Sequence, residues 1–391
     1  MRGMHIAILG RQPKLGMAEL ERYFGSDSVR WFSSNSATIA TDSFSIEQLG
    51  GSLKAGTVTL RIPRGNWRQT AEKIIRTYSE QWSNHEGKIT LGISEYGFNA
   101  TPRDVQHIGI VIKKNLKRHN VSVRLIPNTD SSLNTAVSHH NKLGLAPNKV
   151  ELLIVHSESG DTIVAESTGA QNITALAARD QARPRRDAFV GMLPPKLARL
   201  MLNLATASHP GTTVLDAFCG TGVILQEAWL NNSNVIGTDL SEKMVDYSQE
   251  NMRWLTTRFT RSGSITIDLG DAMTASWPSG IDAVVSETYL GQPFSAPPSP
   301  QKLDEVKKNV NHIVSTFLKN LHPQIAPGTP LCLAVPAWRG SDTHITHLPL
   351  IRSLEELGYA TVQFQHVRPN DLIYYRENQV VARELLVITR K

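Results

Sequence analysis

Apolar stretches alternate with helical stretches through the second half of this chain, and this alternation most constrains its fold. Five short apolar stretches are predicted strands, at 212–218, 233–239, 264–270, 281–287 and 330–336. Strands separated by helices form βαβ units, and the strands of such units lie parallel in one sheet. The sequence therefore predicts an α/β domain with a mostly parallel sheet over residues 188–391.

The helical stretches and the end of the chain complete this domain. Helices are predicted at 194–205, 222–230, 241–255, 301–321 and 344–358, where apolar residues recur with a helical period. A closing pair of apolar stretches, 359–367 and 380–390, predicts a hairpin at the edge of the sheet. The predicted sheet then has seven strands, the arrangement of a Rossmann-like domain.

Residues 1–170 have the mixed pattern of small α+β units. Strands are predicted at 5–11, 36–42, 57–63, 88–97, 121–128, 150–157 and 162–168, and helices at 15–25, 66–82, 102–120 and 131–144. We predict a first domain over 1–85 and a second over 86–170. Residues 171–187 follow as a linker, since Pro184 breaks any helix there.

Charge is unevenly divided along the chain. Residues 1–186 carry 24 Lys and Arg against 16 Asp and Glu, whereas 187–391 carry 17 against 19. A basic front half joined to a near-neutral back half indicates an anionic macromolecule held by one half and modified by the other. Ordinary surface charge is the alternative interpretation.

The cysteine count and the hydropathy exclude several classes of protein. Cys219 and Cys332 form no CxxC pair, and no Cys/His cluster has zinc spacing, so we predict neither a disulfide framework nor a metal site. No stretch of about 18 apolar residues is present, which excludes a membrane span. We predict a cytoplasmic protein.

A glycine turn between the first strand and helix of the α/β domain has the composition of a ligand site. Asp216 ends the strand, and Gly220 and Gly222 allow the backbone to approach a ligand at the helix N-terminus. A dinucleotide site would have a third glycine where this chain has Leu225. A carboxylate with two glycines suits a ligand that carries an amino group and no pyrophosphate, such as S-adenosylmethionine.

Two further acids follow the next two strands. Asp239 is positioned to accept hydrogen bonds from ribose hydroxyls, and Asp271 to accept one from an adenine amine. Three acids at successive strand ends predict a nucleotide site, with helix caps and turn acids as the alternative. The predicted cofactor-binding residues are Asp216, Phe218, Gly220, Gly222, Asp239, Leu240, Asp271 and Ala272.

Several segments resemble the archaeal-type tRNA guanosine N2-methyltransferases that act at position 10 of tRNA. The resemblance is specific over 179–255, with RDQARPRRDAFVGMLPPKLARLMLNLA, VLDAFCGTGVILQEAW and IGTDLSEKMVDYSQENMRWL. It is looser in ILGRQPKLGMAELERYFG and RLIPNTDSSLNTAVSHHNKLG, which are similar to the front end of that family. The closing DLIYYRENQVVARELLVI also resembles the last strands of the family.

This resemblance implies a three-part, S-adenosylmethionine-dependent enzyme. A ferredoxin-like unit and a THUMP domain would hold tRNA, and a Rossmann-like class I methyltransferase domain would bind the cofactor. The segment GMLPPKLA (191–198) would pack beside the cofactor pocket. The sequence leaves open whether a protein partner subunit is required.

The corner after the fourth strand departs from the family pattern. Amine methyltransferases of this kind have Asp or Asn, two prolines and an aromatic residue there, whereas this chain has Ser-Glu-Thr-Tyr-Leu-Gly over 286–291. Glu287 replaces the acid with one more methylene group, and Tyr289 supplies an aromatic ring at a shifted position. We predict that Glu287 aligns a target amine and that Tyr289 stacks on a flipped-out base.

Three interpretations of this corner stay open. The chain is an amine methyltransferase with a variant corner, a methyltransferase acting on another atom or RNA, or a tRNA-binding protein with a vestigial cofactor site. Glu287 as a turn cap and Tyr289 as a packing residue are the structural alternatives. The basic residues predicted to contact RNA are Arg179, Arg183, Arg185, Arg186, Lys113, Lys114 and Lys117.

Overall fold

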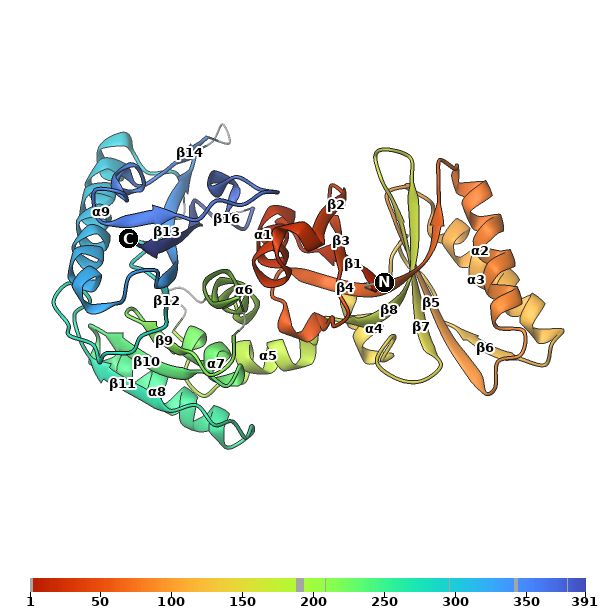
Figure 1. Cartoon of the computed structure of the whole chain (residues 1–391), viewed down its shortest axis with the longest axis horizontal. Helices are drawn as coiled ribbons and strands as arrows, with labels where there is room; N and C mark the ends of the chain where they lie inside the picture. Colours follow the sequence, from red (N-terminus) through yellow and green to blue (C-terminus); the bar gives the residue numbers. More distant parts are fainter. Residues whose placement is uncertain (1–2, 188–192, 208, 295, 341–343, 378) are drawn as a thin grey trace. The chain divides into compact units, whose positions relative to one another are not determined.

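The computed structural model describes residues 3–187, 193–207, 209–294, 296–340, 344–377 and 379–391. These residues divide into two compact units, Met1–Met17 with Phe24–Ala175 and Ala18–Tyr23 with Leu176–Lys391. The chain passes from the first unit to the second within α5 (Ile173–Gln181). Figure 1 labels the elements of both units.

The described residues of the first unit are built on one mixed eight-stranded sheet. Its strands are β1 (Met4–Leu9), β2 (Val29–Ser33), β3 (Ser36–Ala40), β4 (Ser52–Ile62), β5 (Lys88–Tyr96), β6 (Ser122–Leu125), β7 (Lys149–His156) and β8 (Thr162–Ala170). They lie in the order β2-β3-β1-β4-β8-β7-β5-β6, with β5 parallel to β6 and β7 and the other pairs antiparallel. The helices of this part of the chain are α1 (Pro13–Phe24), α2 (Trp67–Gln81), α3 (Pro102–Lys117) and α4 (Thr135–His140), with 3-10 turns at Ser26–Ser28 and Ile46–Gln48.

Helices α2 and α3 lie against each other on one face of this sheet (Figure 1). Each begins with a reciprocal capping box, Asn66 with Gln69 in α2 and Thr101 with Asp104 in α3, which satisfies backbone N–H groups that have no partner within a helix. The apolar face of α3 (Val105, Ile108, Ile112, Leu116) is fully buried. This buries one face of α3 and leaves its lysines on the other.

The two domains predicted at 1–85 and 86–170 share this sheet. Strand β4 pairs with β8 along most of its length, for example Thr57 with Glu166. Residues on both sides of position 85 therefore belong to one compact unit. The division into a ferredoxin-like and a THUMP domain stays a prediction.

The second unit is an α/β domain. Its helices are α6 (Pro195–Thr206), α7 (Val223–Leu230), α8 (Glu242–Thr256) and α9 (Pro300–Leu321). Its strands are β9 (Thr213–Asp216), β10 (Asn234–Asp239), β11 (Ile265–Leu269), β12 (Ala283–Glu287), β13 (Pro330–Arg339), β14 (Ile345–Thr346), β15 (Tyr359–Thr361), β16 (Ile373–Tyr374) and β17 (Val381–Arg390). Short 3-10 turns lie at His322–Gln324, Pro349–Ser353 and Pro369–Asp371.

The sheet of this unit is mostly parallel, as predicted, but its described residues form nine strands rather than seven. Seven strands lie in the order β11-β10-β9-β12-β13-β17-β15, and two-residue strands β14 and β16 pair with β13 and β17. The first five are parallel, and β17 is antiparallel to β13 and β15. The carboxyl ends of β9, β10, β11 and β12 therefore meet at one edge, where α/β sheets bind ligands.

Alternate residues of β13 face opposite layers of this domain. Leu331, Leu333 and Val335 pack with Val314 and Phe317 of α9 in one apolar core. The other face of β12, β13 and β17 is covered by α6. Because side chains alternate along a strand, residue parity decides which layer each residue meets.

One predicted helix is wrong. Residues 344–358 form β14 and the 3-10 turn Pro349–Ser353, rather than an α-helix. Pro349 fits the first position of a helical turn, but it lacks the backbone N–H that a longer helix through this point would need. The leucines that suggested helical periodicity, among them Leu350 and Leu354, are buried in the core that α9 covers.

Candidate functional site

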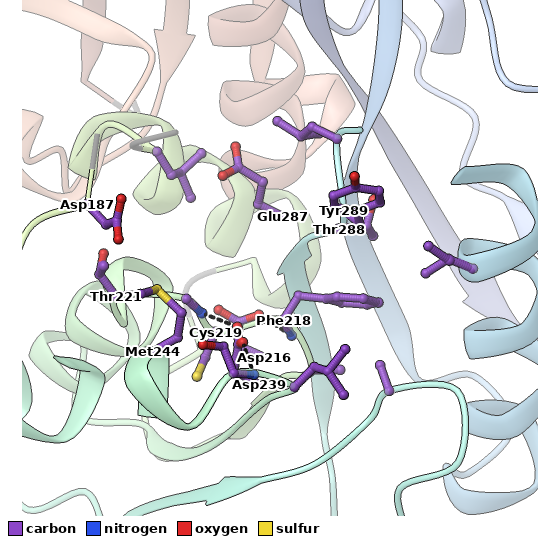
Figure 2. Close-up of a pocket in the computed structure, with 18 of the residues that line it drawn as sticks. Asp187, Asp216, Phe218, Cys219, Thr221, Asp239, Met244, Glu287, Thr288 and Tyr289 are labelled. Carbon is purple, nitrogen blue, oxygen red and sulfur yellow. Dashed lines mark hydrogen bonds between the residues drawn. The ribbon is translucent and has the colours of Figure 1, made fainter. Parts of the chain in front are cut away.

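A cavity of about 940 Å³ opens at the carboxyl edge of β9, β10 and β12 in the second unit. Figure 2 shows residues from the glycine turn, the strand ends and the corner after β12 around one space. Of the residues predicted from sequence, the following line this cavity: Asp216, Phe218, Gly220, Asp239, Leu240, Asp271, Ala272, Glu287 and Tyr289. Parallel strand order thus brings together two sets of residues that are up to 73 positions apart in the sequence.

The glycine turn joins β9 to α7 and lines the cavity. Gly220 has φ +50° and Gly222, the N-cap of α7, has φ +79°, a region that favours glycine. A Cβ atom on Gly222 would lie 2.4 Å from Ser248 Oγ. Gly222 is not among the cavity-lining residues, so its requirement is conformational and steric, whereas Gly220 faces the cavity.

Asp216 is the most deeply buried acid of the site, with 1% of its surface exposed. Its Oδ1 accepts a hydrogen bond from the Phe218 N–H at 3.2 Å. Burial, together with the neighbouring Asp239 and Glu287, raises its pKa to about 8 against the opposing effect of its hydrogen bonds. A buried carboxyl group crowded by other acids is a favourable partner for a cationic ligand group.

Asp239 and Asp271 are held by the backbone around them. Asp239 accepts the Gly220 N–H at 2.9 Å with one oxygen and the Ser241 N–H at 2.9 Å with the other. Asp271 accepts the Met273 N–H at 2.9 Å. These bonds fix both carboxylates at the cavity wall and leave lone pairs for ligand hydroxyl or amine groups.

Apolar side chains complete the part of the wall near these acids. Leu240 exposes 72% of its surface although it lines the cavity, and Met244 and Ala272 also belong to the lining. An exposed leucine between two acids is a surface on which a flat apolar ring gains contact area.

Hydrogen bonds to β13 hold the corner after β12, which lacks the two prolines expected from the resemblance. Thr288 is buried, its N–H donates to Ala334 O at 3.0 Å, and its hydroxyl group donates to the same oxygen at 3.1 Å. The threonine ties the corner to β13 through two bonds. Glu287 and Tyr289 extend from this corner, and Tyr289 exposes 43% of its surface at the cavity (Figure 2).

The Glu287 carboxylate forms an ion pair with Arg383 of β17. Sequence reasoning missed Arg383, because it lies 96 positions from Glu287 and no local pattern links the two residues. The same reasoning missed Asp187 and Lys243, which line the cavity and pair at 2.7 Å. Lys243 could have been predicted to lie near the cavity, because it is in the first turn of α8 and directly follows Asp239-Leu240-Ser241-Glu242.

Two of the arginines predicted to contact RNA are buried, which corrects that interpretation for them. Arg179 is 6% exposed and pairs with Glu227 of α7, which also binds Arg199 at 2.6 Å. Arg183 is 3% exposed, and its guanidinium nitrogens have no hydrogen-bond partner among the described residues. Their sequence neighbours suggested a solvated linker, but α5 and the segment after it pack into the second unit.

The remaining predicted RNA contacts lie on the surface. Arg185 and Arg186 are exposed, and Arg185 pairs with Glu250 at 2.6 Å. Lys113, Lys114 and Lys117 are exposed on the polar face of α3. The segment 191–198 predicted beside the pocket lies only partly in the described residues, since 191 and 192 fall outside them, and Leu193 lines the cavity.

The described residues contain neither a metal-binding cluster nor a membrane-spanning helix. No group of three or more His, Cys, Asp or Glu among them is arranged to hold a metal ion. No helix among them is long and apolar enough to cross a membrane.

Comparison with known proteins indicates the class of the second unit. Residues 208–323 match a family model described as a methyltransferase domain, and residues 69–250 match one described as DNA methylase, the N6/N4 methyltransferase family. The second unit thus contains a methyltransferase domain, and S-adenosylmethionine is its methyl donor.

Curated relatives match shorter stretches. A tRNA (guanine(10)-N2)-dimethyltransferase of Methanothermobacter thermautotrophicus is 33% identical over 161 residues, 40% of this chain and 43% of the relative. The corresponding protein of Pyrococcus abyssi is 32% identical over 104 residues, 27% of this chain and 26% of the relative. The matches thus cover less than half of the length of either relative.

The fold as a whole has a solved counterpart. TrmN from Thermus thermophilus superposes with a TM-score of 0.55 over 100% of both chains, at 17% identity. At that identity the similarity is one of fold, and it extends through both units of the chain.

The cavity fits S-adenosylmethionine on its own chemistry. The ligand has an ammonium group, two ribose hydroxyl groups and an adenine amine, all of which donate hydrogen bonds. The cavity wall offers the carboxyl groups of Asp216, Asp239 and Asp271 as acceptors, and Leu240, Met244 and Ala272 add apolar surface to the lining. Its volume lies within the range of ligand-sized pockets, about 300 to 1,000 Å³.

Proposed function

We propose that this protein transfers a methyl group from S-adenosylmethionine to the exocyclic N2 amine of a guanosine in tRNA. The observation that carries the proposal is the single cavity that joins the three acids Asp216, Asp239 and Asp271 to Glu287 and Tyr289. The proposed binding site for the methyl donor and the proposed binding site for a planar base with an amine group are therefore adjacent in one cavity. The guanine-N2 activity for which the curated relatives are named supports the choice of guanosine N2.

In this proposal the acids hold the cofactor. The buried Asp216 pairs with the ammonium group, Asp239 accepts from the ribose hydroxyls, and Asp271 accepts from the adenine amine. When bound, S-adenosylmethionine supplies an electrophilic methyl group on a sulfonium that is already a good leaving group. The protein therefore needs to place the amine rather than to activate it strongly.

Glu287 and Tyr289 place the base. A guanine N2 amine is a weak nucleophile because its lone pair delocalises into the ring. The Glu287 carboxylate accepts hydrogen bonds from the amine and holds its nitrogen in one orientation, and it can take the proton that the amine loses. The half-exposed Tyr289 ring offers a stacking surface to a base that has left its helix.

In this proposal the first unit binds the RNA. We propose that it contains a ferredoxin-like region and a THUMP domain, and that it binds tRNA through exposed basic residues such as Lys113, Lys114 and Lys117. Charge supports this, since residues 1–186 carry the excess of Lys and Arg. Position 10, named for the relatives, is the proposed target, and the cytoplasm is the proposed location.

Methylation of another nucleotide or atom is the second candidate function. It is favoured by the match of residues 69–250 to a DNA methylase family and by the altered corner at 286–291. A tRNA-binding protein with a vestigial site is disfavoured, because the cavity keeps its acids, its glycine turn and its volume.

The test is incubation of the purified protein with unmodified tRNA transcripts and methyl-labelled S-adenosylmethionine, followed by nucleoside mass spectrometry. N2-methylguanosine, absent with Asp216→Ala, is the expected product, and its position follows from nuclease mapping. Detection of N6-methyladenosine instead would identify adenosine N6, rather than guanosine N2, as the target atom. Binding of S-adenosylmethionine without any methylated product would contradict the proposal.

A further inference from the structure

Arg383 reaches Glu287 across an intervening strand. In the register of the sheet, Glu287 of β12 lies beside Ala334 of β13, and Arg383 of β17 lies beside Pro336. Residues 334 and 336 share a face of β13, so Glu287 and Arg383 project on the same side. Because the two β13 residues between them are small, the Arg383 Nε–H can donate to Glu287 Oε1 over the strand.

This pair is largely removed from water. The Glu287 side chain is 16% exposed and the Arg383 side chain 9%. Within the described residues, Arg383 makes the only hydrogen bond to the Glu287 carboxylate. An arginine that lies mostly out of water beside a carboxylate supplies both charge balance and a fixed orientation. The carboxylate still lines the cavity, with free lone pairs on both oxygens.

An ion-paired carboxylate is an acceptor only, and this restricts which base edge it can meet. Guanine presents two adjacent donors, N1–H and the N2 amine. Adenine presents an amine donor beside the N1 lone pair, and cytosine an amine donor beside the N3 lone pair. A carboxylate facing either of these would oppose a lone pair with a lone pair, whereas guanine satisfies both oxygens.

We propose that Arg383 is a positioning residue that holds Glu287 as a two-point acceptor for guanine N1–H and N2–H, and so makes this corner selective for guanine. The proposal rests on the proposed function and adds to it the base edge that is recognised and the residue that orients its partner. It also accounts for the longer acid at the corner, since an added methylene lets the carboxylate meet both Arg383 and the base.

A single-nucleotide substitution in the RNA isolates this recognition. Replacing the target guanosine by 2,6-diaminopurine riboside keeps the N2 amine but converts N1 from a donor to an acceptor. We expect the wild-type kcat/KM to fall by at least about 100-fold, because a buried acceptor would face a lone pair. Glu287→Gln offers one acceptor and one donor, so its ratio of guanosine to diaminopurine kcat/KM should fall to about one or below.

Arg383 is tested by the same ratio in Arg383→Met and Arg383→Lys. Losing a charged hydrogen bond to Glu287 should reduce the selectivity of the Met variant by about 10- to 100-fold, whereas the Lys variant keeps a cation and should stay closer to wild type. Because both substrates are measured with one preparation, the ratio does not depend on the folded fraction. RNA affinity for the two substrates, measured with S-adenosylhomocysteine present, gives a second readout independent of turnover.

The outcomes separate this proposal from the proposed function. Wild-type selectivity in Arg383→Met would overturn the positioning role, and wild-type selectivity in Glu287→Gln would overturn recognition of the guanine edge. In both cases N2-methylguanosine formation by the wild type would still stand. Absence of N2-methylguanosine from the wild-type enzyme on any tRNA would instead remove the proposed function, and this inference with it.

Discussion

Burial of the Asp216 carboxyl group is unfavourable for its charged form, yet the same group is proposed to bind the cofactor. It ends β9 inside the domain, and its exposed fraction is 1%. Burial, with Asp239 and Glu287 nearby, raises its pKa to about 8. The neutral form is therefore favoured in the folded protein until a cationic ligand arrives, which links ligand binding, protonation and stability at one side chain.

The first prediction concerns Asp216 and pH. Its folded pKa is raised above the unfolded value, so the folded state holds a proton that the unfolded state releases between about pH 4 and 8. The free energy of unfolding of the wild type, relative to Asp216→Asn, should decrease by at most about 1.4 kcal/mol per pH unit across that window and level off above it. Urea unfolding of both proteins at several pH values measures this. A pH-independent difference would show that Asp216 does not titrate there.

The second prediction concerns Tyr289. Stacking on a base is worth about 1 to 3 kcal/mol, so Tyr289→Ala should lower kcat/KM for tRNA by about 10- to 100-fold. Tyr289→Phe keeps the ring and should stay within a few-fold of wild type. Calorimetry with S-adenosylmethionine should show similar cofactor affinity for both variants. A large loss of kcat/KM in Tyr289→Phe would assign the role to the hydroxyl group instead of the ring.

At the scale of single elements, α3 separates two functions on two faces. Its apolar face is buried with α2 and the sheet, while Lys113, Lys114 and Lys117 stay in solvent. Charge changes on the outer face should therefore affect ligand binding without disturbing the core.

The third prediction follows from that face. Replacing Lys113, Lys114 and Lys117 by Gln should weaken tRNA binding and reduce the slope of log affinity against log salt by up to about 3, because fewer counterions are released. Filter binding over a range of salt concentrations measures the slope.

The control for this prediction removes the same charge elsewhere. Lys302, Lys308 and Lys391 are also exposed, and their replacement by Gln changes the net charge equally. If the control lowers the slope as much as the α3 variant does, net charge rather than the α3 face explains the effect.

The corner after β12 is a second element whose local structure positions functional side chains. The family pattern uses prolines to shape it, whereas here Thr288 ties it to Ala334 through its N–H and its hydroxyl group. Two hydrogen bonds thus hold the corner against the neighbouring strand. This leaves Glu287 and Tyr289 at the cavity despite the altered sequence.

At the scale of the whole molecule, the chain has two compact units, and the whole candidate cofactor cavity lies in the second. A ligand that binds only folded protein stabilises the part that forms its site. The two units should therefore respond differently to the cofactor.

The fourth prediction uses this division. S-adenosylhomocysteine at about 100 times its dissociation constant should add about 2.7 kcal/mol to the stability of the second unit. Hydrogen exchange followed by mass spectrometry should show slower exchange in peptides of Leu176–Lys391, with little change in Phe24–Ala175. Equal protection of both units would indicate that they unfold as one, and Asp216→Ala should abolish the effect.

Much of the second unit and its site could be predicted from local sequence. The strands at 212–218 and 233–239, the glycine turn and the acids at strand ends depend on periodicity and on turn chemistry, which neighbouring residues determine. Parallel βαβ order then brings Asp216, Asp239 and Asp271 to one edge by topology alone.

What tertiary structure alone decided depends on contacts between residues far apart in the chain. Arg383 pairs with Glu287 only because β17 returns beside β13, and no local pattern predicts the register of that return. Arg179 and Arg183 looked like surface cations, yet packing buries them, since burial depends on what covers a segment. Local chemistry in this sequence thus specified the elements and the cofactor acids, whereas sheet order and packing determined which side chains meet at the corner where the base is proposed to bind.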